Sequence, residues 1–425
     1  MFRAASTLAA FKPKAAAPTL FRSMSFWQNV KMGPADPILG VNEAFKKDTH
    51  DKKVLVGVGA FRDDNGKPLV LTAVRKAEEL ILKQNLDKEY LPIIGLDSFN
   101  KAAIRFAYGS QSAPILENRI AITQSLSGTG SLRIGAAFIE RFMPKGTKVY
   151  VPKPTWGNHL SVFSDARVET CEYRYFDPKT NGLNIVGLLE DLNNAPNGSV
   201  VLLHGCAHNP TGVDPTQDQW AQILQVVKNK NLLPFFDVAY QGFASGDPVR
   251  DAYSLRLFTD AGLQVMLAQS FAKNMGLYGE RIGSFSIVCA TPEEKDCVLS
   301  QIKILVRPLY SSPPLNGARI AEKVLNDPEL NKLWLVELKA MADRIINMRQ
   351  LLRSYLENDF KSTHDWSHIT NQIGMFCFTG LSPAQVDRLK DEFHIYLTRN
   401  GRISVAGVNT KNAKYIAEAF HQVTK

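Results

Sequence analysis

Residues 269–281 read QSFAKNMGLYGER and follow a short apolar run, Val265–Ala268. A run of this kind is typical of a strand that is buried in a sheet. The sequence therefore predicts a strand that ends in a loop carrying Lys273, with Ser270 and Arg281 close by. Lysine is the side chain that forms Schiff bases with carbonyl compounds. A hydroxyl and an arginine beside it favour an amine that attacks a carbonyl compound while a phosphate is held nearby.

Further apolar runs predict the rest of the sheet. They lie at residues 149–151, 200–203 and 234–236, and a helical stripe separates the last two. That stripe consists of Trp220, Ile223, Leu224 and Val227. Another helical stripe, at residues 96–107, precedes the first run. Strands that alternate with helices predict an α/β fold, in which a mostly parallel sheet is covered on both faces. The strand-end loops of such a sheet meet at one edge, where ligands bind.

Size and composition exclude several classes of protein. The chain has 425 residues, which is enough to bury one or two cores. No apolar run approaches the roughly 18 residues that a membrane-spanning helix needs. The formal net charge is +9, but the basic residues do not cluster with aromatic residues as in a nucleic-acid groove. The five cysteines lack CxxC spacing, which indicates reduced thiols.

The first 35 residues have a composition of their own. They contain no acidic residue, and their basic residues are Arg3, Lys12, Lys14, Arg22 and Lys31. They also lack the continuous apolar core of a secretory signal. This composition is typical of a mitochondrial transit peptide, so we expect residues 1–23 to direct import into the mitochondrial matrix. A disordered tail of a cytosolic enzyme is the alternative.

A glycine-rich segment, Ser125–Leu132, leads into a predicted helix at residues 133–143. Free amide groups and the positive end of the helix dipole make such a turn suitable for a phosphate. A dinucleotide site of the G-x-G-x-x-G type is not favoured, because Arg133 stands where the third glycine is required. A plain helix cap remains the alternative to a monophosphate site.

The segment after residues 200–203 carries polar side chains. His204, Cys206 and His208 alternate, so on a strand they would share one face. The alternation leaves zinc conceivable but supplies no fourth ligand, and packed or hydrogen-bonded histidines are the favoured interpretation. Asn209 precedes a proline, which favours extended backbone and could fix its amide for hydrogen bonding.

Four other residues have two interpretations each. Asp237 directly follows Phe235-Phe236, and a carboxylate beside a buried strand is costly unless it is paired. It is either the partner of a protonated ring nitrogen or a helix N-cap. Trp156 lies either against a planar cofactor or in the core. Arg307 and Arg402 could each clamp a carboxylate, and solvated surface is the alternative.

Together these segments resemble the aspartate aminotransferase family of fold-type-I pyridoxal-phosphate enzymes, and its mitochondrial members in particular. The resemblance covers nearly all of the chain after the leader. Its landmarks are MGP at 32–34, DPILG at 36–40, GVGA at 57–60, KEYLP at 88–92, HNPTG at 208–212 and SFAKN at 270–274. One departure is Ser312, where the family commonly has asparagine, and it concerns the subunit interface rather than the chemistry.

The resemblance implies pyridoxal 5'-phosphate as cofactor and a ping-pong transfer of the amino group of L-aspartate to 2-oxoglutarate, giving oxaloacetate and L-glutamate. The catalytic residues would be Lys273, Asp237, Tyr240 and Trp156. Lys273 would carry the Schiff base. Asp237 would pair with the ring nitrogen, with His159 and His204 behind it in a hydrogen-bond network. The other cofactor-binding residues would be Ser127, Gly128, Thr129, Asn209, Ser270, Arg281 and Tyr90 of the neighbouring subunit. The substrate-binding residues would be Gly59, Trp156, Asn209, Arg402 and Arg307 of the neighbouring subunit. No metal is expected.

The resemblance also implies a homodimer with shared sites. Each chain would have a large domain at residues 70–340, built on a seven-stranded, mostly parallel sheet, and a smaller α/β domain. The small domain would combine part of residues 24–69, which begin with an N-terminal arm, with residues 341–425. A helical pattern from Pro328 toward Asp359 would bridge the two domains.

The sequence leaves three other functions as alternatives. The nearest is an aromatic or prephenate aminotransferase of the same fold. A catalytically silent binding protein on the same scaffold is less favoured, because the lysine, aspartate and arginine set is complete. A nucleotide-dependent oxidoreductase is disfavoured by the glycine spacing.

Overall fold

The computed structural model describes residues 25–33 and 37–425, which belong to two separate units. Residues 25–33 are a short segment with exposed Phe26 and Trp27 side chains. Residues 37–425 form a compact unit that contains every described helix and strand. No helix within these described residues has the length and hydropathy of a membrane span. The expected transit peptide, residues 1–23, lies outside the described residues.

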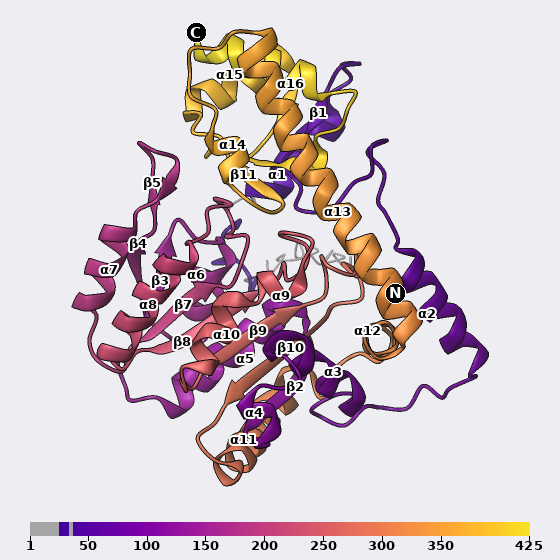
Figure 1. Ribbon diagram of the computed structural model, residues 1–425, viewed down its shortest axis with the longest axis vertical. Coiled ribbons are helices and arrows are strands. Elements are labelled where there is room, and N and C mark those ends of the chain that lie inside the picture. The colour runs from indigo at the N-terminus through magenta and orange to yellow at the C-terminus, as the bar shows by residue number, and fades with distance from the viewer. Residues whose placement is uncertain (1–24, 34–36) are drawn as a thin grey trace, which may run out of the picture. The chain divides into compact units, whose positions relative to one another are not determined.

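A seven-stranded sheet forms the centre of residues 37–425 (Figure 1). Its strands in spatial order are β2 (Ile120–Leu126), β10 (Ile282–Val288), β9 (Met266–Ser270), β8 (Leu233–Val238), β7 (Val200–His204), β3 (Val149–Lys153) and β4 (Thr170–Arg174). Strand β10 runs antiparallel to both of its neighbours, and the other six strands of this sheet share one direction. The prediction of a mostly parallel sheet is therefore confirmed. The predicted apolar runs all lie in strands of this sheet.

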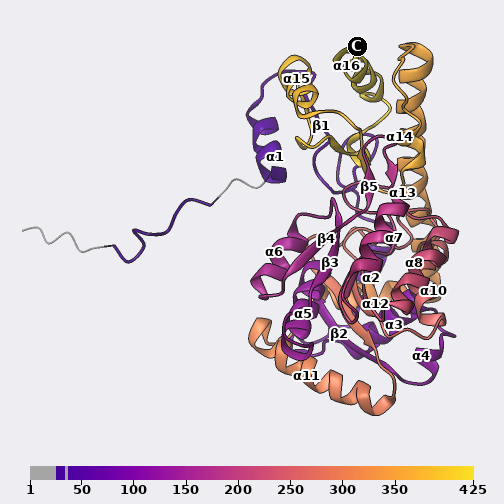
Figure 2. The same cartoon turned by 90° about the vertical axis from the view of Figure 1, so that its left-hand side faces the viewer.

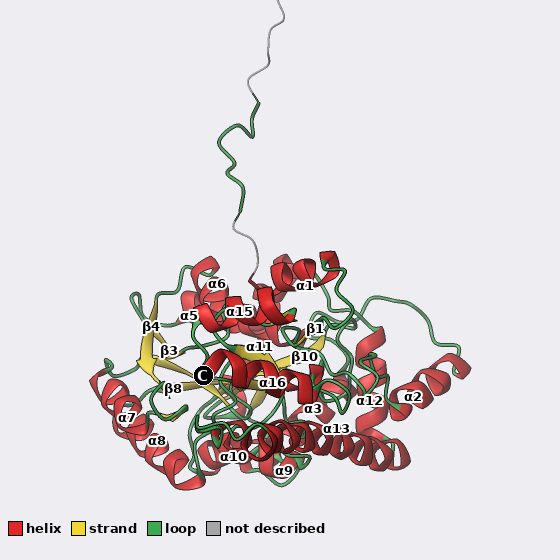
Figure 3. Cartoon of the chain, turned by 90° about the horizontal axis from the view of Figure 1, so that it is seen from above, coloured by secondary structure: helices red, strands yellow, loops and turns green. Residues whose placement is uncertain are grey.

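Helices cover both faces of this sheet (Figure 3). One face packs against α3 (Asp97–Tyr108), α7 (Ile185–Asn194), α8 (Gln217–Asn229) and α10 (Tyr253–Asp260). The other face packs against α5 (Ser127–Phe142), α6 (Asn158–Asp165) and α11 (Pro292–Tyr310). Successive strand residues point to opposite faces, so Leu203 and Phe236 join the first core while Leu202 and Phe235 join the second. The two predicted helical stripes correspond to α3 and α8.

The other elements are shorter. Three two-stranded sheets pair β1 (Val54–Leu55) with β12 (Ile395–Tyr396), β11 (Phe376–Phe378) with β13 (Arg402–Ser404), and β5 (Phe176–Asp177) with β6 (Gly182–Leu183). The further helices are α1 (Pro37–Lys47), α2 (Thr72–Lys83), α4 (Ala113–Leu116), α9 (Pro248–Asp251), α12 (Asn316–Asn326), α14 (His368–Asn371), α15 (Pro383–Phe393), α16 (Ala413–Thr424) and a 3-10 turn, Val405–Gly407. Figure 2 shows α15 and α16 at one end and α11 at the other, with the seven-stranded sheet between them.

The predicted long helix is α13 (Pro328–Ser354), which continues as a π-helix, Tyr355–Asp359. Asp327 caps its start, because the side chain accepts the N–H groups of Glu329 and Leu330. The helix contacts α2 and α12 as well as α14 and α16, so it links the large sheet to the C-terminal helices (Figure 1). The pairing of β1 with β12 joins the two sequence segments expected to form the small domain. The domain limits themselves stay a prediction.

Candidate active site

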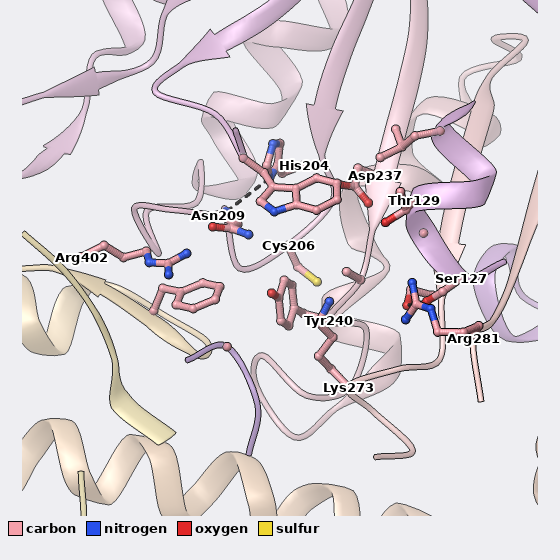
Figure 4. Close-up of a pocket in the computed structure, with 17 residues that line it drawn as sticks. Ser127, Thr129, His204, Cys206, Asn209, Asp237, Tyr240, Lys273, Arg281 and Arg402 are labelled. Atoms are coloured by element: carbon pink, nitrogen blue, oxygen red, sulfur yellow. Dashed lines mark hydrogen bonds between the residues drawn. The ribbon is translucent and has the colours of Figure 1, made fainter. Parts of the chain in front are cut away.

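A pocket of about 250 Å³ opens where β7, β8 and β9 end (Figure 4). The start of α5 and the β11–β13 pair complete its wall. It is lined by Gly59, Ser127, Gly128, Thr129, Leu132, Trp156, His204, Cys206, Asn209, Asp237, Ala239, Tyr240, Ser270, Lys273, Arg281, Phe376 and Arg402. Every predicted cofactor-binding or substrate-binding residue lines this pocket except Tyr90 and Arg307. The edge is the one at which an α/β sheet collects its ligand-binding loops.

Lys273 lies in the turn directly after β9, as the sequence predicts. Its Nζ atom is 5.3 Å from the centre of the Tyr240 ring. Burial lowers the pKa of this amine, the Asp237 carboxylate opposes that shift, and the Arg281 charge adds to it. A lowered pKa leaves more of the amine uncharged near neutral pH, as a nucleophile or a general base requires.

Asp237 lies within β8, beside His204 of β7, so the alternative of a helix N-cap is wrong. Its Oδ2 atom accepts a hydrogen bond from His159 Nε2 at 3.0 Å. Burial alone would raise the pKa of Asp237, but the bond from His159 and the nearby positive groups hold it below its usual value. The carboxylate therefore stays ionised and can pair with a cation in the pocket.

A chain of hydrogen bonds behind Asp237 has a fixed direction. The backbone N–H of Asn209 donates to His204 Nδ1 at 3.2 Å, so uncharged His204 carries its proton on Nε2 (Figure 4). That nitrogen lies 3.4 Å from Thr155 Oγ1, and the Thr155 hydroxyl donates to His159 Nδ1 at 2.8 Å. His159 in turn carries its proton on Nε2 and donates it to Asp237. The Asn209 amide thus sets the tautomer of His204, and the Asp237 carboxylate sets that of His159.

The buried histidines should make the protein sensitive to acid. Burial lowers the pKa of His204 to about 3, and burial also holds the pKa of His208 below its ordinary value. Histidine in an unfolded chain has a pKa of about 6.5, so below that pH the unfolded chain binds more protons than the folded one. The free energy of unfolding should therefore fall as the pH is lowered from about 7 to about 5. Denaturant titrations at both pH values measure the fall. His208→Gln should make it smaller, and an unchanged fall in that variant would contradict the assignment.

The start of α5 forms one end of the pocket. The helix begins at Ser127, so the prediction that it begins at residue 133 is wrong. Residues 127–132 of the glycine-rich segment form its first turn and a half, and Ser125 and Leu126 are the end of β2. No side chain of the described residues caps the first amide groups, which does not support the helix-cap alternative. Those donors are therefore available to an anion. Ser127 Oγ lies 2.8 Å from Ser270 Oγ, and Arg281 lines the same end. Hydroxyls, free amides and a guanidinium together fit a phosphate.

Arg402 lies at the opposite end of the pocket, on β13. Its side chain is buried, its Nη2 donates to the Gly57 carbonyl at 3.0 Å, and its guanidinium carbon is 4.4 Å from the centre of the Phe376 ring. Its Nε atom has no hydrogen-bond partner within the part of the chain that the structure describes. A buried guanidinium with a spare donor favours an anionic ligand such as a carboxylate.

Gly59 faces the same phenylalanine. A Cβ atom at this position would lie 2.9 Å from Phe376 Cζ, so any side chain would displace the ring from Arg402. The glycine therefore keeps the end of the pocket at Arg402 open. This agrees with its predicted place beside the substrate.

Asn209 and Tyr240 lie between the two ends (Figure 4), and Trp156 also lines the pocket. The Trp156 ring stands edge-on to the His159 ring, with 5.2 Å between the centres, and is partly exposed toward the pocket. Asn209 Oδ1 is buried and lacks a hydrogen-bond partner among the described residues. The Tyr240 hydroxyl belongs to a buried side chain that also lines the pocket. A planar ligand between them would find one aromatic face and two polar groups.

Tyr90 and Arg307 lie away from this pocket. Tyr90 is 90% exposed, and Arg307 is an exposed residue in the last turn of α11, where its Nη1 is 2.6 Å from Ser311 Oγ. The family resemblance implies that both residues complete the pocket of a neighbouring subunit, and these two roles stay predictions.

Several residues of the site were not predictable from the sequence or were not predicted. Thr155 adjoins Trp156 and could have been found as the hydroxyl nearest to His159. Cys206 was noted in the alternating run but given no role. Phe376 carried no signal, because only the pairing of β11 with β13 brings it to Arg402. Leu132 and Ala239 read as ordinary apolar positions.

The alternating histidines are packed rather than arranged around a metal. The His208 ring stacks on Tyr175, with 4.0 Å between the centres, and lies 4.2 Å from the His204 ring. Within the described residues no group of three His, Cys, Asp or Glu side chains is placed to hold a metal ion.

The fold and this pocket agree with a family comparison. The model of the class I and II aminotransferases matches residues 51–420, and the chain belongs to that family.

Several of the individual relatives are mitochondrial aspartate aminotransferases. The chain is 58% identical over 413 residues to mitochondrial aspartate aminotransferase of Gallus gallus, covering 97% of each chain. It is 55% identical over 401 residues to that of Dictyostelium discoideum, covering 94% of each. Among solved structures, a mitochondrial aspartate aminotransferase of Trypanosoma brucei is 44% identical with a TM-score of 0.87, covering 91% of this chain and all of that one.

A further solved structure, similar to this chain, is of an enzyme that contains pyridoxal phosphate and is named for aromatic amino acids. It is an aromatic-amino-acid aminotransferase of Burkholderia pseudomallei that is covalently bound to pyridoxal phosphate. It is 44% identical to this chain with a TM-score of 0.92, and the match covers 95% of this chain and all of that one.

Proposed function

We propose that the chain is an aspartate aminotransferase, which transfers the amino group of L-aspartate to 2-oxoglutarate with pyridoxal 5'-phosphate as cofactor. The products are oxaloacetate and L-glutamate, formed in two half-reactions at one pocket. The observation that carries the proposal is the convergence of Lys273, Asp237 and the start of α5 at one strand edge, with Arg402 opposite. The identity of 58% to a curated aspartate aminotransferase supports this choice of substrates.

The pocket fits the cofactor at each of its polar ends. The uncapped amides of α5, the paired Ser127 and Ser270 hydroxyls and Arg281 would hold the phosphate. Asp237 would pair with the ring nitrogen, since His159 bonds its Oδ2 atom and keeps the group ionised. Lys273 would hold the cofactor covalently. Once bound, pyridoxal phosphate supplies a carbonyl that accepts amines and a ring that withdraws electrons from the reacting carbon.

The remaining groups would orient the ligands and move the proton. Trp156 would cover one face of the ring, and Asn209 and Tyr240 would hydrogen bond to its phenolic oxygen. Arg402 would hold the α-carboxylate of the amino acid with its guanidinium, whose Nε donor has no partner among the described residues. Lys273 Nζ would then accept the α-proton of the bound amino acid as a general base, which its lowered pKa permits.

The proposal includes a homodimer with shared pockets. Tyr90 and Arg307 are exposed in one chain and lie away from its own pocket, so they are free to reach a second copy. Tyr90 of each subunit would add to the phosphate site of the other, and Arg307 would bind the side-chain carboxylate of the substrate. The small domain, formed by part of 24–69 and 341–425, would carry Arg402 over the cofactor held by residues 70–340. The mitochondrial relatives support the matrix as the place of action.

An aromatic aminotransferase is the second candidate, because a neighbour of that activity is 44% identical to this chain. Kinetics with aspartate and tyrosine distinguish the two, and we expect higher kcat/KM for aspartate. Arg307→Ala should lower kcat/KM for aspartate by about 30- to 5000-fold, the effect of removing one member of a desolvated charge pair. Tyrosine has no side-chain carboxylate and should lose far less. Arg250→Ala, an exposed arginine outside the pocket, is the control. An equal loss on both substrates would contradict the role of Arg307.

A further inference from the structure

We infer that Gln124 is a positioning residue that holds the two segments carrying Tyr90 and Arg307 in place for the neighbouring subunit. The inference rests on the proposed function, because it requires that these two segments complete the partner's pocket. Gln124 is fully buried in β2 and touches no part of the pocket of its own chain.

The first contact of Gln124 is with the segment after Tyr90. Its backbone N–H donates to the Ile94 carbonyl at 2.8 Å, and its side-chain Oε1 accepts the backbone N–H of Leu96 at 3.1 Å. Gly95 between them has φ +88, and a Cβ atom there would lie 2.3 Å from Gln124 Cβ. The chain therefore passes over Gln124 at a distance that only glycine allows.

The second contact is with the segment after Arg307. The side-chain Nε2 of Gln124 donates to the Pro314 carbonyl at 2.7 Å, and the Tyr310 hydroxyl donates to the Gln124 carbonyl at 3.2 Å. Arg307 itself is bonded to Ser311, between these two anchor points. One residue thus fixes both ends of the turn that follows α11.

The geometry requires an amide. Gln124 uses its side-chain oxygen as an acceptor for one segment and its side-chain nitrogen as a donor for the other, and a buried group must fill both roles or leave a backbone group unpaired. β2 is one of the two edge strands of the large sheet, since among the described strands it pairs with β10 alone. Its open edge is therefore the place where both segments can be attached to a rigid element.

Different residues of β2 therefore support different pockets. The strand ends at Leu126, next to Ser127 of its own pocket, whereas Gln124 supports residues destined for the partner's pocket. A defect at Gln124 should consequently appear in the active site of the other subunit.

The test begins with homodimers. Gln124→Met keeps the length of the side chain and removes both hydrogen bonds, and we expect kcat/KM for aspartate to fall roughly 10- to 100-fold, as for a small misplacement of a distant binding group. Tyr310→Phe removes one anchor with less risk to folding and should give a smaller fall in the same direction. Gln385→Met, which removes another side-chain amide with two backbone partners on α15, outside the pocket, should lower the melting temperature without this change in kcat/KM. Wild-type kinetics in both Gln124→Met and Tyr310→Phe would overturn the inference.

Hybrid dimers locate the defect. In a dimer of one Lys273→Ala subunit and one Gln124→Met subunit, the single competent pocket belongs to the Gln124→Met subunit and receives Tyr90 and Arg307 from the subunit with intact Gln124. We expect kcat/KM per competent pocket to return to the wild-type value. A hybrid that stays impaired would show that Gln124 acts within its own subunit and would overturn the inference. If Gln124→Met does not fold, Tyr310→Phe takes its place in the hybrid with the same two outcomes.

A second hybrid separates this inference from the proposed function. A dimer of one Lys273→Ala and one Arg307→Ala subunit should also regain wild-type kcat/KM, because its competent pocket receives an intact Arg307. Failure of this hybrid would overturn the sharing of pockets and the inference with it. Recovery of this hybrid without recovery of the Gln124→Met hybrid would overturn the inference alone.

Discussion

Lys273→Ala should lower the rate of amino transfer by about 10⁴-fold, the upper end of what a positioned general base contributes. The substitution removes the amine that would both hold the cofactor covalently and accept the α-proton. Among the described residues no other lysine lines the pocket, so no neighbouring amine of that part of the chain can replace it. The fold should survive, because an alanine leaves no charge to bury and the pocket is open to solvent. The measurements are kcat with aspartate and 2-oxoglutarate and the visible absorbance of the purified protein.

The visible absorbance shows whether the loss of activity comes from the missing covalent bond between Lys273 and the cofactor. Wild-type protein reconstituted with pyridoxal phosphate should show a band that changes when aspartate is added, and Lys273→Ala should lack the band of the covalent form. Lys303→Ala, an exposed lysine of α11, is the matched control and should behave as wild type. A colourless wild-type protein that stays inert with the cofactor would contradict the proposed function. Normal turnover in Lys273→Ala would contradict the role of this lysine alone.

Asp237→Asn should lower kcat by about 30- to 5000-fold, as for a buried cation whose charged partner is removed. Asparagine has nearly the shape of aspartate and can still accept the His159 Nε2–H, so the hydrogen-bond chain should remain intact. What disappears is the negative charge that would keep the cofactor ring nitrogen protonated. Stopped-flow measurement of the aspartate half-reaction reports the loss directly.

A neighbouring carboxylate supplies the control for this substitution. Asp214 is buried near the same loop and accepts the backbone N–H groups of Ala207 and His208, but it does not line the pocket. Burial raises the pKa of Asp214 to about 6, so it lacks the bias toward ionisation that Asp237 has. Asp214→Asn should therefore change kcat by less than about tenfold. Equal losses in the two variants would indicate a general effect of burial rather than a specific charge.

The strand ends were predictable because their physical causes are local. Lys273 and Asp237 each follow an apolar run, and a buried strand with a polar residue at its end is visible in a single stretch of sequence. The helix α5 was placed too late because serine and glycine favour turns in isolation. In the folded chain the contacts of Ser131 and Leu132 with the sheet extend the helix back to Ser127.

The rest of the site depends on contacts between distant segments. Phe376 reaches Arg402 through the pairing of two short strands, and Gln124 meets residues that lie far from it in sequence in both directions. Neither position differs from an ordinary core residue when its neighbours in the chain are read alone. Thr155 is a similar case, since its role exists only once His159 and His204 stand on either side of it.

The amide of Asn209 gives the hydrogen-bond chain an origin that side-chain mutation cannot reverse. Every amino acid except proline carries the same backbone N–H, so sequence drift at position 209 could alter how a substrate is held while the charge behind it stays oriented. A substitution at position 209 would therefore remove the side-chain contact with the phenolic oxygen of the cofactor but keep the tautomer of His204. Side-chain and backbone roles of this one residue can thus be separated by any substitution except proline.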